Sequence, residues 1–476
     1  MSREKTFYIT TTLPYINSEP HIGFAAEIIK ADIIARFKRQ QGYEVFFNTG
    51  TDEHGLKIYR KAQELNMDTQ EYCDQVAEKF KRLKEVLNLS YNNFVRTTDP
   101  DHIEAAQHFW QLCEKNGDIY KKNYQVNYCV GCEMEKTESE LENNRCPLHP
   151  NQDLEIIEEE NYFFRWSKYQ TQLLELYKKN PEYVYPKHRL NEISNFVKKG
   201  LQDFSISRLK EKMPWGISVP GDDTQVMYVW FDALINYISS LGWPNNTEQF
   251  EKFWPGIQVA GKDNLRQQSA MWQGMLMSAG LPNSNNVLVF GFLTSEGQKI
   301  SKSLGNQISP EEYTKKFGTD ALRYYLISQM PIFADGDFSK DKFIETYNSD
   351  LGNDLGNLAV RLTNLIEKQN LTLKLEKNSD IELNETLVDR LSQYQLKEAL
   401  ETIWKKVRGI NEYLTKEAPW KIEDATEKEA ILENAAQKLY DVALALEPFL
   451  PETSEKLRNQ FEASNITKGE PLFPRR

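Results

Sequence analysis

The sequence has no long apolar run and no excess of positive charge. No stretch of its 476 residues approaches the ~20 consecutive apolar residues that span a bilayer. The short charged start runs directly into an apolar strand pattern, and no small-residue cleavage site follows it. These absences argue against a membrane-spanning or secreted protein, and we expect a cytoplasmic one.

The net charge is −12, whereas proteins that bind nucleic acid are often basic. This charge does not exclude such a function, because a large acidic protein can bind RNA through local basic patches. The composition therefore leaves RNA binding open.

Cysteine is scarce, but its spacing is informative. The total of five is odd and three cysteines fall within 18 residues, which is not the arrangement of a disulfide framework. Cys129 and Cys132, followed by Cys146 and His149, have the C-x2-C and C-x2-H spacing of a closed zinc site. Thiolate and imidazole donors favour Zn²⁺ over Mg²⁺. We expect one structural zinc ion, the alternative being free buried cysteines.

Alternating strand and helix patterns predict an α/β fold with a doubly wound, Rossmann-like parallel sheet. Residues 6–12 are β-branched and aromatic, as in a buried strand. Helical spacing follows Pro20 and stops at Gly42, and a second strand pattern covers 45–47. The alternation pauses, then resumes with a strand at 226–229.

Four segments result from these patterns. We expect the first half of the Rossmann domain at 1–116, a connective insertion with the zinc knuckle at 117–220 and the second half at 221–330. From 331 to 476 we expect a region leading into an all-α helical bundle. Because no further domain follows the bundle, we expect a monomer.

Two short motifs have residues that suit phosphate binding, but each motif taken alone is weak evidence. His21 and Gly23 follow the first strand at a helix start, where free N–H groups favour phosphate; a simple capping histidine is the alternative. Lys299 and Lys302 lie in a Ser/Gly-rich loop that suits a clamp on a triphosphate. A solvated charged loop is the alternative for that motif.

In this order and at this separation, the two motifs resemble the two signatures of class I aminoacyl-tRNA synthetases. Further blocks narrow the resemblance to the methionyl-tRNA synthetases over essentially the whole chain. These blocks are Leu13–Tyr15, Thr49–Gly55, Tyr228–Ala233, Gly261–Asp263, Asp320–Tyr325, Asp354–Leu358, Ala418–Trp420 and Pro471–Pro474.

The resemblance implies a ligase that activates methionine with ATP and Mg²⁺ and transfers it to tRNA(Met). The catalytic residues that it implies are His21, Gly23, Lys299 and Lys302. The ATP-binding residues would be Pro14, His21, Gly23, Phe24, Gly261, Asp263, Lys299 and Lys302. The methionine-binding residues would be Leu13, Tyr15, Asp52, Trp230, Ala233, Tyr237 and Gln268. Among the latter, Asp52 would hold the ammonium group, with Trp272 beneath the pocket unless it is ordinary core.

The same resemblance implies a stem-contact region and an anticodon-binding bundle in 331–476. Asn357 and Arg361 lie one helical turn apart and, with Trp420, match the family's anticodon-reading residues. A tryptophan can stack on a splayed base, and the other two side chains can hydrogen-bond base edges. A capped surface helix is the alternative.

The active-site blocks depart from the family pattern at five positions. Phe24 replaces a histidine, and the loss of one transition-state donor commonly costs about 10²–10³ in rate. Gln267 and Gln268 occupy the place of a pocket histidine, while Leu234 and Gln273 replace prolines. Two interpretations remain open: a working synthetase with compensating contacts, or a weakened paralogue that binds RNA or activates another small molecule. A synthetase for isoleucine, valine or leucine is disfavoured, because the insertion is too short for an editing domain.

Overall fold

The computed structural model describes residues 5–17, 19–132, 134–136, 140–295, 297–300, 307–371, 373, 375–376 and 385–476. The chain forms two compact units. The first comprises Met1–Pro20, Tyr43–Arg82 and Tyr91–Phe290. The second comprises His21–Gly42, Leu83–Ser90 and Gly291–Arg476.

A six-stranded sheet in the order β3-β2-β1-β12-β13-β7 forms the centre of the first unit, and all its pairs are parallel. Its strands are β1 (Thr6–Thr11), β2 (Glu44–Thr51), β3 (Asn93–Arg96), β7 (Val184–Tyr185), β12 (Ile257–Gly261) and β13 (Asn286–Phe290). The predicted parallel sheet is confirmed. Its edge strand β7 comes from within 117–220 and pairs with β13 through Val287 and Leu288.

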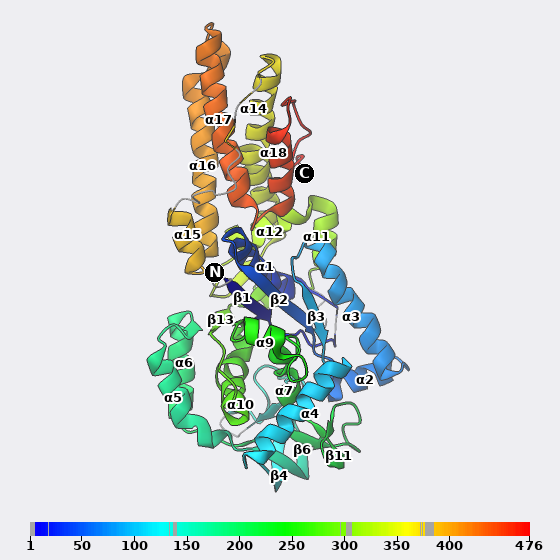
Figure 1. Ribbon diagram of the computed structural model, residues 1–476. Helices are drawn as coiled ribbons and strands as arrows, with labels where there is room; N and C mark the ends of the chain where they lie inside the picture. The colour runs from blue at the N-terminus through cyan, green and yellow to red at the C-terminus, as the bar shows by residue number, and fades with distance from the viewer. Residues whose placement is uncertain are drawn as a thin grey trace. The chain divides into compact units, whose positions relative to one another are not determined.

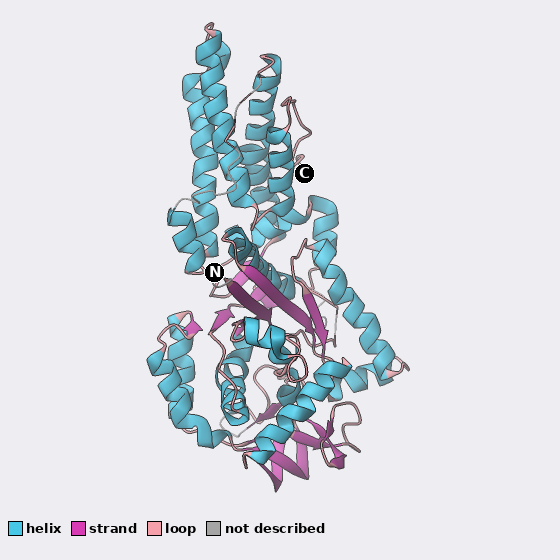
Figure 2. Cartoon of the chain, in the orientation of Figure 1, coloured by secondary structure: helices cyan, strands magenta, loops and turns pink. Residues whose placement is uncertain are grey.

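An aromatic core packs within this unit. Figures 1 and 2 show the helices and strands of the chain. The helices of the unit are α2 (Leu56–Glu64), α3 (Thr69–Val86, reaching into the second unit), α4 (Pro100–Lys115), α5 (Gln170–Lys179), α6 (Lys187–Lys198), α7 (Val229–Ala233), α8 (Asn236–Ser239), α9 (Thr247–Phe253) and α10 (Trp272–Ala279). Phe109 on α4 stacks on Trp272 of α10 with ring centroids 5.6 Å apart. Because aromatic side chains pack tightly, this contact fixes the position of α10 against α4.

The connective segment is mainly antiparallel. One sheet has the order β5-β4-β6-β8 and a second the order β10-β11-β9. The strands are β4 (Ile119–Cys129), β5 (Met134–Lys136), β6 (Glu155–Phe164), β8 (Phe204–Ser205), β9 (Ser207–Leu209), β10 (Ser218–Val219) and β11 (Asp222–Met227). The strand predicted at 226–229 is therefore placed wrongly: β11 ends at Met227 and pairs antiparallel with β9. An apolar run of this length does not reveal which sheet it joins.

The second unit is predominantly helical (Figure 2). Its helices are α1 (Ile22–Gln40), α11 (Pro310–Phe317), α12 (Thr319–Ser328), α13 (Lys340–Thr346), the π-helix η6 (Tyr347–Gly356), α14 (Asn357–Lys368), α15 (Glu385–Ser392), α16 (Leu396–Glu417), α17 (Ala425–Leu446) and α18 (Pro451–Glu462). A small sheet, β15-β14-β16, comprises β14 (Leu293–Ser295), β15 (Gln298–Lys299) and β16 (Gly336–Phe338). The predicted C-terminal helical bundle is confirmed. Among the described helices, each one is too short or too polar to cross a membrane.

Candidate active site and metal centre

The carboxyl ends of three neighbouring strands bring predicted site residues together in the first unit. Leu13, Pro14 and Tyr15 follow β1, and the Asp52 backbone N–H donates to the Pro14 carbonyl at 3.0 Å. Gly261 ends β12, which lies beside β1, and Asp263 follows in the short 3-10 helix Lys262–Asn264. Parallel sheets bind ligands at this edge, so the placement suits a nucleotide and a small amino acid.

Glu53 anchors the turn that carries Asp52. The Arg96 guanidinium contacts both Glu53 carboxylate oxygens, at 2.7 and 2.8 Å, and the Thr98 hydroxyl donates to the same carboxylate at 2.6 Å. Glu53 is fully buried, so the bidentate contact and the hydroxyl together satisfy a charge that burial would otherwise make costly. Asp52, which is 6 % exposed, is thereby held at the carboxyl edge of the sheet.

Helix α7, which carries Trp230 and Ala233, is held by a buried carboxylate between two histidines. His54 Nδ1 lies 2.7 Å from Asp232, and His102 Nε2 lies 2.9 Å from the other oxygen of that carboxylate. Full burial opposes ionisation of Asp232, but the two imidazoles outweigh it and hold the pKa of Asp232 below its usual value. Because His54 lies in the Thr49–Gly55 block and Asp232 in the Tyr228–Ala233 block, this contact joins two of the blocks that carried the resemblance.

Tyr237 is fixed at both ends. The Tyr8 hydroxyl donates to the Tyr237 carbonyl at 2.9 Å, and the Gln268 side-chain amide donates to the Tyr237 hydroxyl. Tyr237 also meets Trp272 edge to face with centroids 5.9 Å apart. Trp272 is completely buried, so the structure gives it the environment of a core residue.

Gln268, one of the departures from the family pattern, is a well-bonded residue. It is 1 % exposed, it accepts from the Gln258 amide at 2.8 Å and it donates to Tyr237. Gln273, another departure, donates to the Gln268 carbonyl at 2.9 Å. The buried amides of Gln268 and Gln273 therefore both find hydrogen-bond partners. Gln267 instead contacts the Met134 sulfur at 3.3 Å, and Leu234 is buried in the core.

The other predicted nucleotide-binding residues lie in the second unit. His21 is the N-cap of α1, immediately before the first turn, and its Nδ1 accepts the Gly23 N–H at 3.1 Å. A Cβ on Gly23 would lie 2.9 Å from the His21 ring, so glycine permits this cap. Burial lowers the pKa of His21, which keeps the ring neutral and able to accept. Phe24 follows in the first turn and is half-buried.

The lysine motif is only partly described. Lys299 is the last residue of β15, with a described backbone, whereas its side chain and Lys302 lie outside the described residues. The structure therefore places the start of the motif at the end of a small sheet.

The four predicted metal ligands lie together. The ligand atoms of Cys129, Cys132, Cys146 and His149 all fall within 4.8 Å of one another. The Cys132 sulfur is 3.4 Å from Cys146 and 3.2 Å from His149 Nδ1. A Cβ on Gly131 would lie 2.5 Å from the His149 ring, so the knuckle closes only with glycine there. Three sulfurs and one imidazole nitrogen at this separation could hold one metal ion.

The metal knuckle contacts predicted pocket residues through Lys57 on α2. The Lys57 ammonium donates to the Gly131 carbonyl at 3.3 Å and lies 5.9 Å from the centre of the Tyr15 ring. Gln267 contacts Met134 on β5. The knuckle thus lies beside the pocket residues within the first unit.

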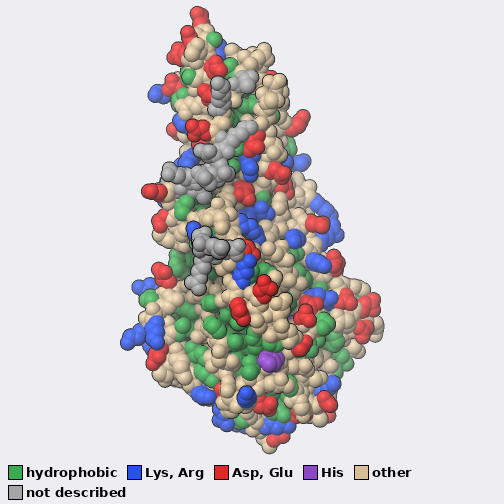
Figure 3. Space-filling view, viewed as in Figure 1, with side chains coloured by type: hydrophobic (Ala, Val, Ile, Leu, Met, Phe, Trp, Pro, Cys, Tyr) green, Lys and Arg blue, Asp and Glu red, His purple; other side chains and the backbone are tan. Residues whose placement is uncertain are grey.

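The predicted anticodon residues gather on the helical bundle. Asn357 begins α14, and Arg361 lies one turn further along the same helix. The Arg361 guanidinium lies 4.7 Å from the centre of the Trp420 ring, and Trp420 is 48 % exposed. Such an exposed indole backed by a guanidinium can accept a stacked base. On the face in Figure 3, acidic and basic side chains are interspersed, consistent with binding through local groups.

The parallel sheet, the site residues at its carboxyl edge and the helical bundle together define a class I aminoacyl-tRNA synthetase. The family model described as "tRNA synthetases class I (M)" matches residues 7–153 and 131–363. By this match, and by the relatives below, the chain belongs to the methionyl-tRNA synthetase family.

Relatives and solved structures agree on this family. The methionine–tRNA ligase of Thermotoga maritima is 42 % identical, covering 98 % of this chain and 80 % of its own length. That of a Synechocystis species is also 42 % identical, covering 96 % and 89 %. The structure of Mycobacterium tuberculosis methionyl-tRNA synthetase in complex with methionyl-adenylate matches with a TM-score of 0.90, 35 % identity and coverage of 99 % and 98 %. These matches confirm the resemblance to the methionyl-tRNA synthetases that the sequence motifs indicated.

Proposed function

We propose that the protein is a methionine–tRNA ligase. In the first step the methionine carboxylate oxygen attacks the α-phosphorus of ATP, the α–β phosphoanhydride bond breaks, and pyrophosphate leaves with the bond's electron pair. In the second step a hydroxyl of the terminal tRNA ribose attacks the methionyl carbonyl, loses its proton and displaces AMP. The observation that carries this proposal is the 0.90 TM-score, over 99 % of the chain, to a synthetase bound to methionyl-adenylate.

Neither step requires a covalent protein nucleophile, so the chain's task is positioning and charge stabilisation. Asp52, held by the anchored Glu53 turn, would bind the ammonium group of methionine. Leu13, Tyr15, Trp230, Ala233, Tyr237 and Gln268 would enclose the side chain, and aromatic walls suit a thioether. Gly261 and Asp263 would hold the ribose, since a carboxylate accepts from vicinal hydroxyls.

Pro14 is proposed as a further ATP contact in the first unit. The remaining ATP contacts are proposed for the second unit, where His21, Gly23 and Phe24 at the start of α1 would contact the nucleotide, favoured by the free N–H groups of a helix start. Lys299 and Lys302 would neutralise the leaving pyrophosphate. Mg²⁺, bound with ATP, supplies further charge neutralisation on the phosphates.

The metal knuckle is proposed to hold one structural zinc ion. Cys129, Cys132, Cys146 and His149 supply the soft donors that suit zinc, and four protein ligands leave no position for a reacting water. The ion would stabilise the knuckle beside Lys57 and take no part in the reaction.

Recognition of tRNA(Met) is proposed for the bundle. Trp420 would stack on an anticodon base, with Asn357 and Arg361 reading base edges. We further propose a cytoplasmic monomer; light scattering at micromolar concentration tests the oligomeric state, and a stable dimer would refute that part.

Methionine-dependent exchange of pyrophosphate into ATP tests the first step. We expect exchange in the protein, and a Phe24→His variant shows what the phenylalanine costs. No exchange in the protein but exchange in the variant would identify a synthetase silenced at one contact. No exchange in either, with tRNA still bound, would refute the ligase and favour an RNA-binding paralogue.

A further inference from the structure

The helix that carries two of the proposed anticodon-reading residues begins directly after a π-helix. Asn357 is the first residue of α14 and Arg361 lies one turn later, whereas η6 covers Tyr347–Gly356. A π-helix closes its hydrogen bonds over one more residue than an α-helix, so each residue turns the chain through a smaller angle. The side of α14 on which Asn357 and Arg361 lie therefore depends on how η6 is held.

One face of α16 holds the end of η6. The Arg408 guanidinium donates to the Asp354 carboxylate at 3.0 Å, and the Asn411 side-chain amide donates to the Asp354 backbone carbonyl at 2.9 Å. Arg408 and Asn411 are three residues apart, so they lie on the same face of α16. Asp354 is thus held by both its side chain and its backbone. We call Asp354, Arg408 and Asn411 the η6 clamp.

The same face of α16 continues toward the reading residues. Thr415 lies one turn after Asn411, and its hydroxyl oxygen accepts from the Arg361 guanidinium at 3.5 Å. Arg361 also contacts the ring of Trp420, which follows the end of α16 at Glu417. A single helix therefore contacts the end of η6 and one reading residue, and leads into another.

We propose that the η6 clamp is a positioning device that makes Arg408 and Asp354 determinants of anticodon selectivity. The clamp holds η6 against α16, which keeps the two reading residues of α14 in register with Trp420. Arg408 and Asp354 act on the RNA only through those residues. A correct base gains from donors that are held in place and a wrong base gains little, so a displaced reading residue lowers the difference between their affinities.

A direct contact between Arg408 and an RNA phosphate is the competing explanation. The Arg408 side chain is 56 % exposed, against 31 % for Asp354, so RNA can reach the cation. The two explanations differ in the effect of neutralising Asp354, which breaks the clamp but leaves the cation in place. A phosphate contact would then bind RNA as before or more tightly, whereas a positioning device would lose its effect. The proposal rests on the proposed function, because it requires the bundle to read the anticodon.

The test compares the charging of tRNA(Met) with that of the same tRNA carrying one altered anticodon base. The ratio of kcat/KM for the two tRNAs measures selectivity. We expect Arg408→Met and Asp354→Asn each to lower this ratio by about fivefold, the upper limit for an ion pair that solvent reaches. The double variant should lower it no further than either single variant, and ATP–pyrophosphate exchange should be unchanged in all three.

Reversal of the pair tests whether the contact itself matters. Arg408→Asp alone should lower the ratio, because it places two carboxylates together. Arg408→Asp combined with Asp354→Arg rebuilds an ion pair with opposite polarity and should restore most of the lost selectivity. A phosphate contact would not be restored in this way, since the cation would have moved to η6.

Arg458→Met is the matched control. It breaks the ion pair between Arg458 and Glu462, which lie 3.7 Å apart with side chains 41 % and 35 % exposed. Both residues belong to α18, which carries none of the proposed reading residues, so selectivity should not change. Thermal unfolding identifies any variant that is not folded, and the other single variant of the clamp then decides.

Unchanged selectivity in folded Arg408→Met or Asp354→Asn protein would overturn the clamp while leaving the ligase assignment intact. Equal weakening for both tRNAs in Arg408→Met alone would also overturn it and would identify a phosphate contact. Unchanged charging of tRNA(Met) by Trp420→Ala would overturn the proposed anticodon recognition, and the clamp's role with it. Absence of methionine-dependent exchange in the unaltered protein would overturn the ligase assignment itself.

Discussion

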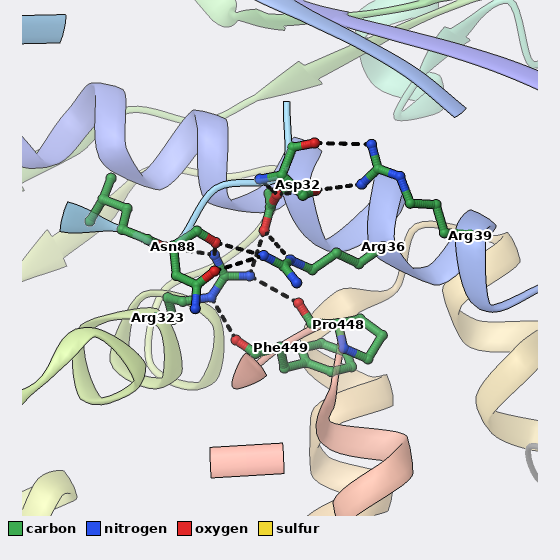
Figure 4. Close-up of polar contacts among 9 residues, drawn as sticks. Asp32, Arg36, Arg39, Asn88, Arg323, Pro448 and Phe449 are labelled. Carbon is green, nitrogen blue, oxygen red and sulfur yellow. Dashed lines mark hydrogen bonds and ion pairs between the residues drawn. The ribbon is translucent and has the colours of Figure 1, made fainter. Parts of the chain in front are cut away.

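Arg323 and Asp32 form a completely buried ion pair in the second unit, with the guanidinium Nη2 2.8 Å from the carboxylate (Figure 4). Asp32 lies on α1 and Arg323 on α12. Arg323 also donates to the Phe449 and Pro448 carbonyls at 2.8 and 2.9 Å. Helix α1, which His21 caps, is therefore tied to the turn that precedes α18.

Loss of this pair should be costly to stability. Arg323→Met would leave Asp32 buried without its main partner, and we expect a fall of about 3–5 kcal/mol in the free energy of unfolding. Denaturant titration measures it. Lys315→Met, which breaks the exposed pair with Glu311, is the control and should change stability by less than about 1 kcal/mol. An Arg323 variant as stable as this control would contradict the prediction.

Asp320 predicts a pH effect in the same unit. It is 3 % exposed, accepts the Thr453 N–H at 2.6 Å, and burial raises its pKa to about 6 from 3.8. The folded state thus binds this proton more tightly than the unfolded state. Its contribution to stability is present below pH 3.8 and is lost as the pH rises through about 6.

Asp320→Asn removes that titration. The stability of the unaltered protein relative to the variant should therefore decrease between about pH 4 and pH 7, by at most about 3 kcal/mol. Denaturant titrations of both proteins at each pH provide the measurement. A difference that stays constant, or grows with pH, would show that Asp320 has no raised pKa.

Metal content tests the knuckle. Elemental analysis should find one zinc per chain. A strong chelator should remove the zinc and make three thiols reactive, those of Cys129, Cys132 and Cys146. Cys73 and Cys113 are buried elsewhere and should react only on unfolding. Cys132→Ser should lower zinc occupancy, whereas Cys113→Ser should not. A metal-free protein with three reactive thiols would contradict the site.

The Trp420 face separates tRNA binding from adenylation. Trp420→Ala removes a stacking surface worth about 1–3 kcal/mol per base. We expect kcat/KM for tRNA to fall about 10- to 100-fold, with pyrophosphate exchange unchanged. Lys438→Ala removes a similar cation–ring contact with Tyr413 on the same bundle and should change neither rate. Equal effects of the two variants would mean that Trp420 is not a specific contact.

The sequence predicted the elements that local pattern determines. The first strand, α1 and its end near Gly42 follow from β-branched residues, helical spacing and a positive-φ glycine. The metal cluster follows from ligand spacing alone. Pairing between distant segments was harder: β11 has an apolar end but joins an antiparallel sheet, and the two-residue strand β7 gives no periodic signal.

The polar networks could not be predicted for a similar reason. The Asp32–Arg323 pair joins residues 291 apart in the chain. The sequence around a charged residue does not show which distant residue will pair with it once both are buried. One buried amide left a signal: Gln258 is a polar residue within the apolar strand β12, which implies a buried partner. The sequence does not show which residues these partners are. Gln268, Gln273 and Ser284 come close to Gln258 only when the chain folds.

The most direct test of the account is the charging of tRNA(Met) with methionine by the purified protein, in the presence of ATP and Mg²⁺. We expect methionyl-tRNA to accumulate, and the same tRNA with an altered anticodon to be charged far more slowly. No charging, although the protein is folded and binds the tRNA, would contradict the assignment of this chain as a methionine–tRNA ligase.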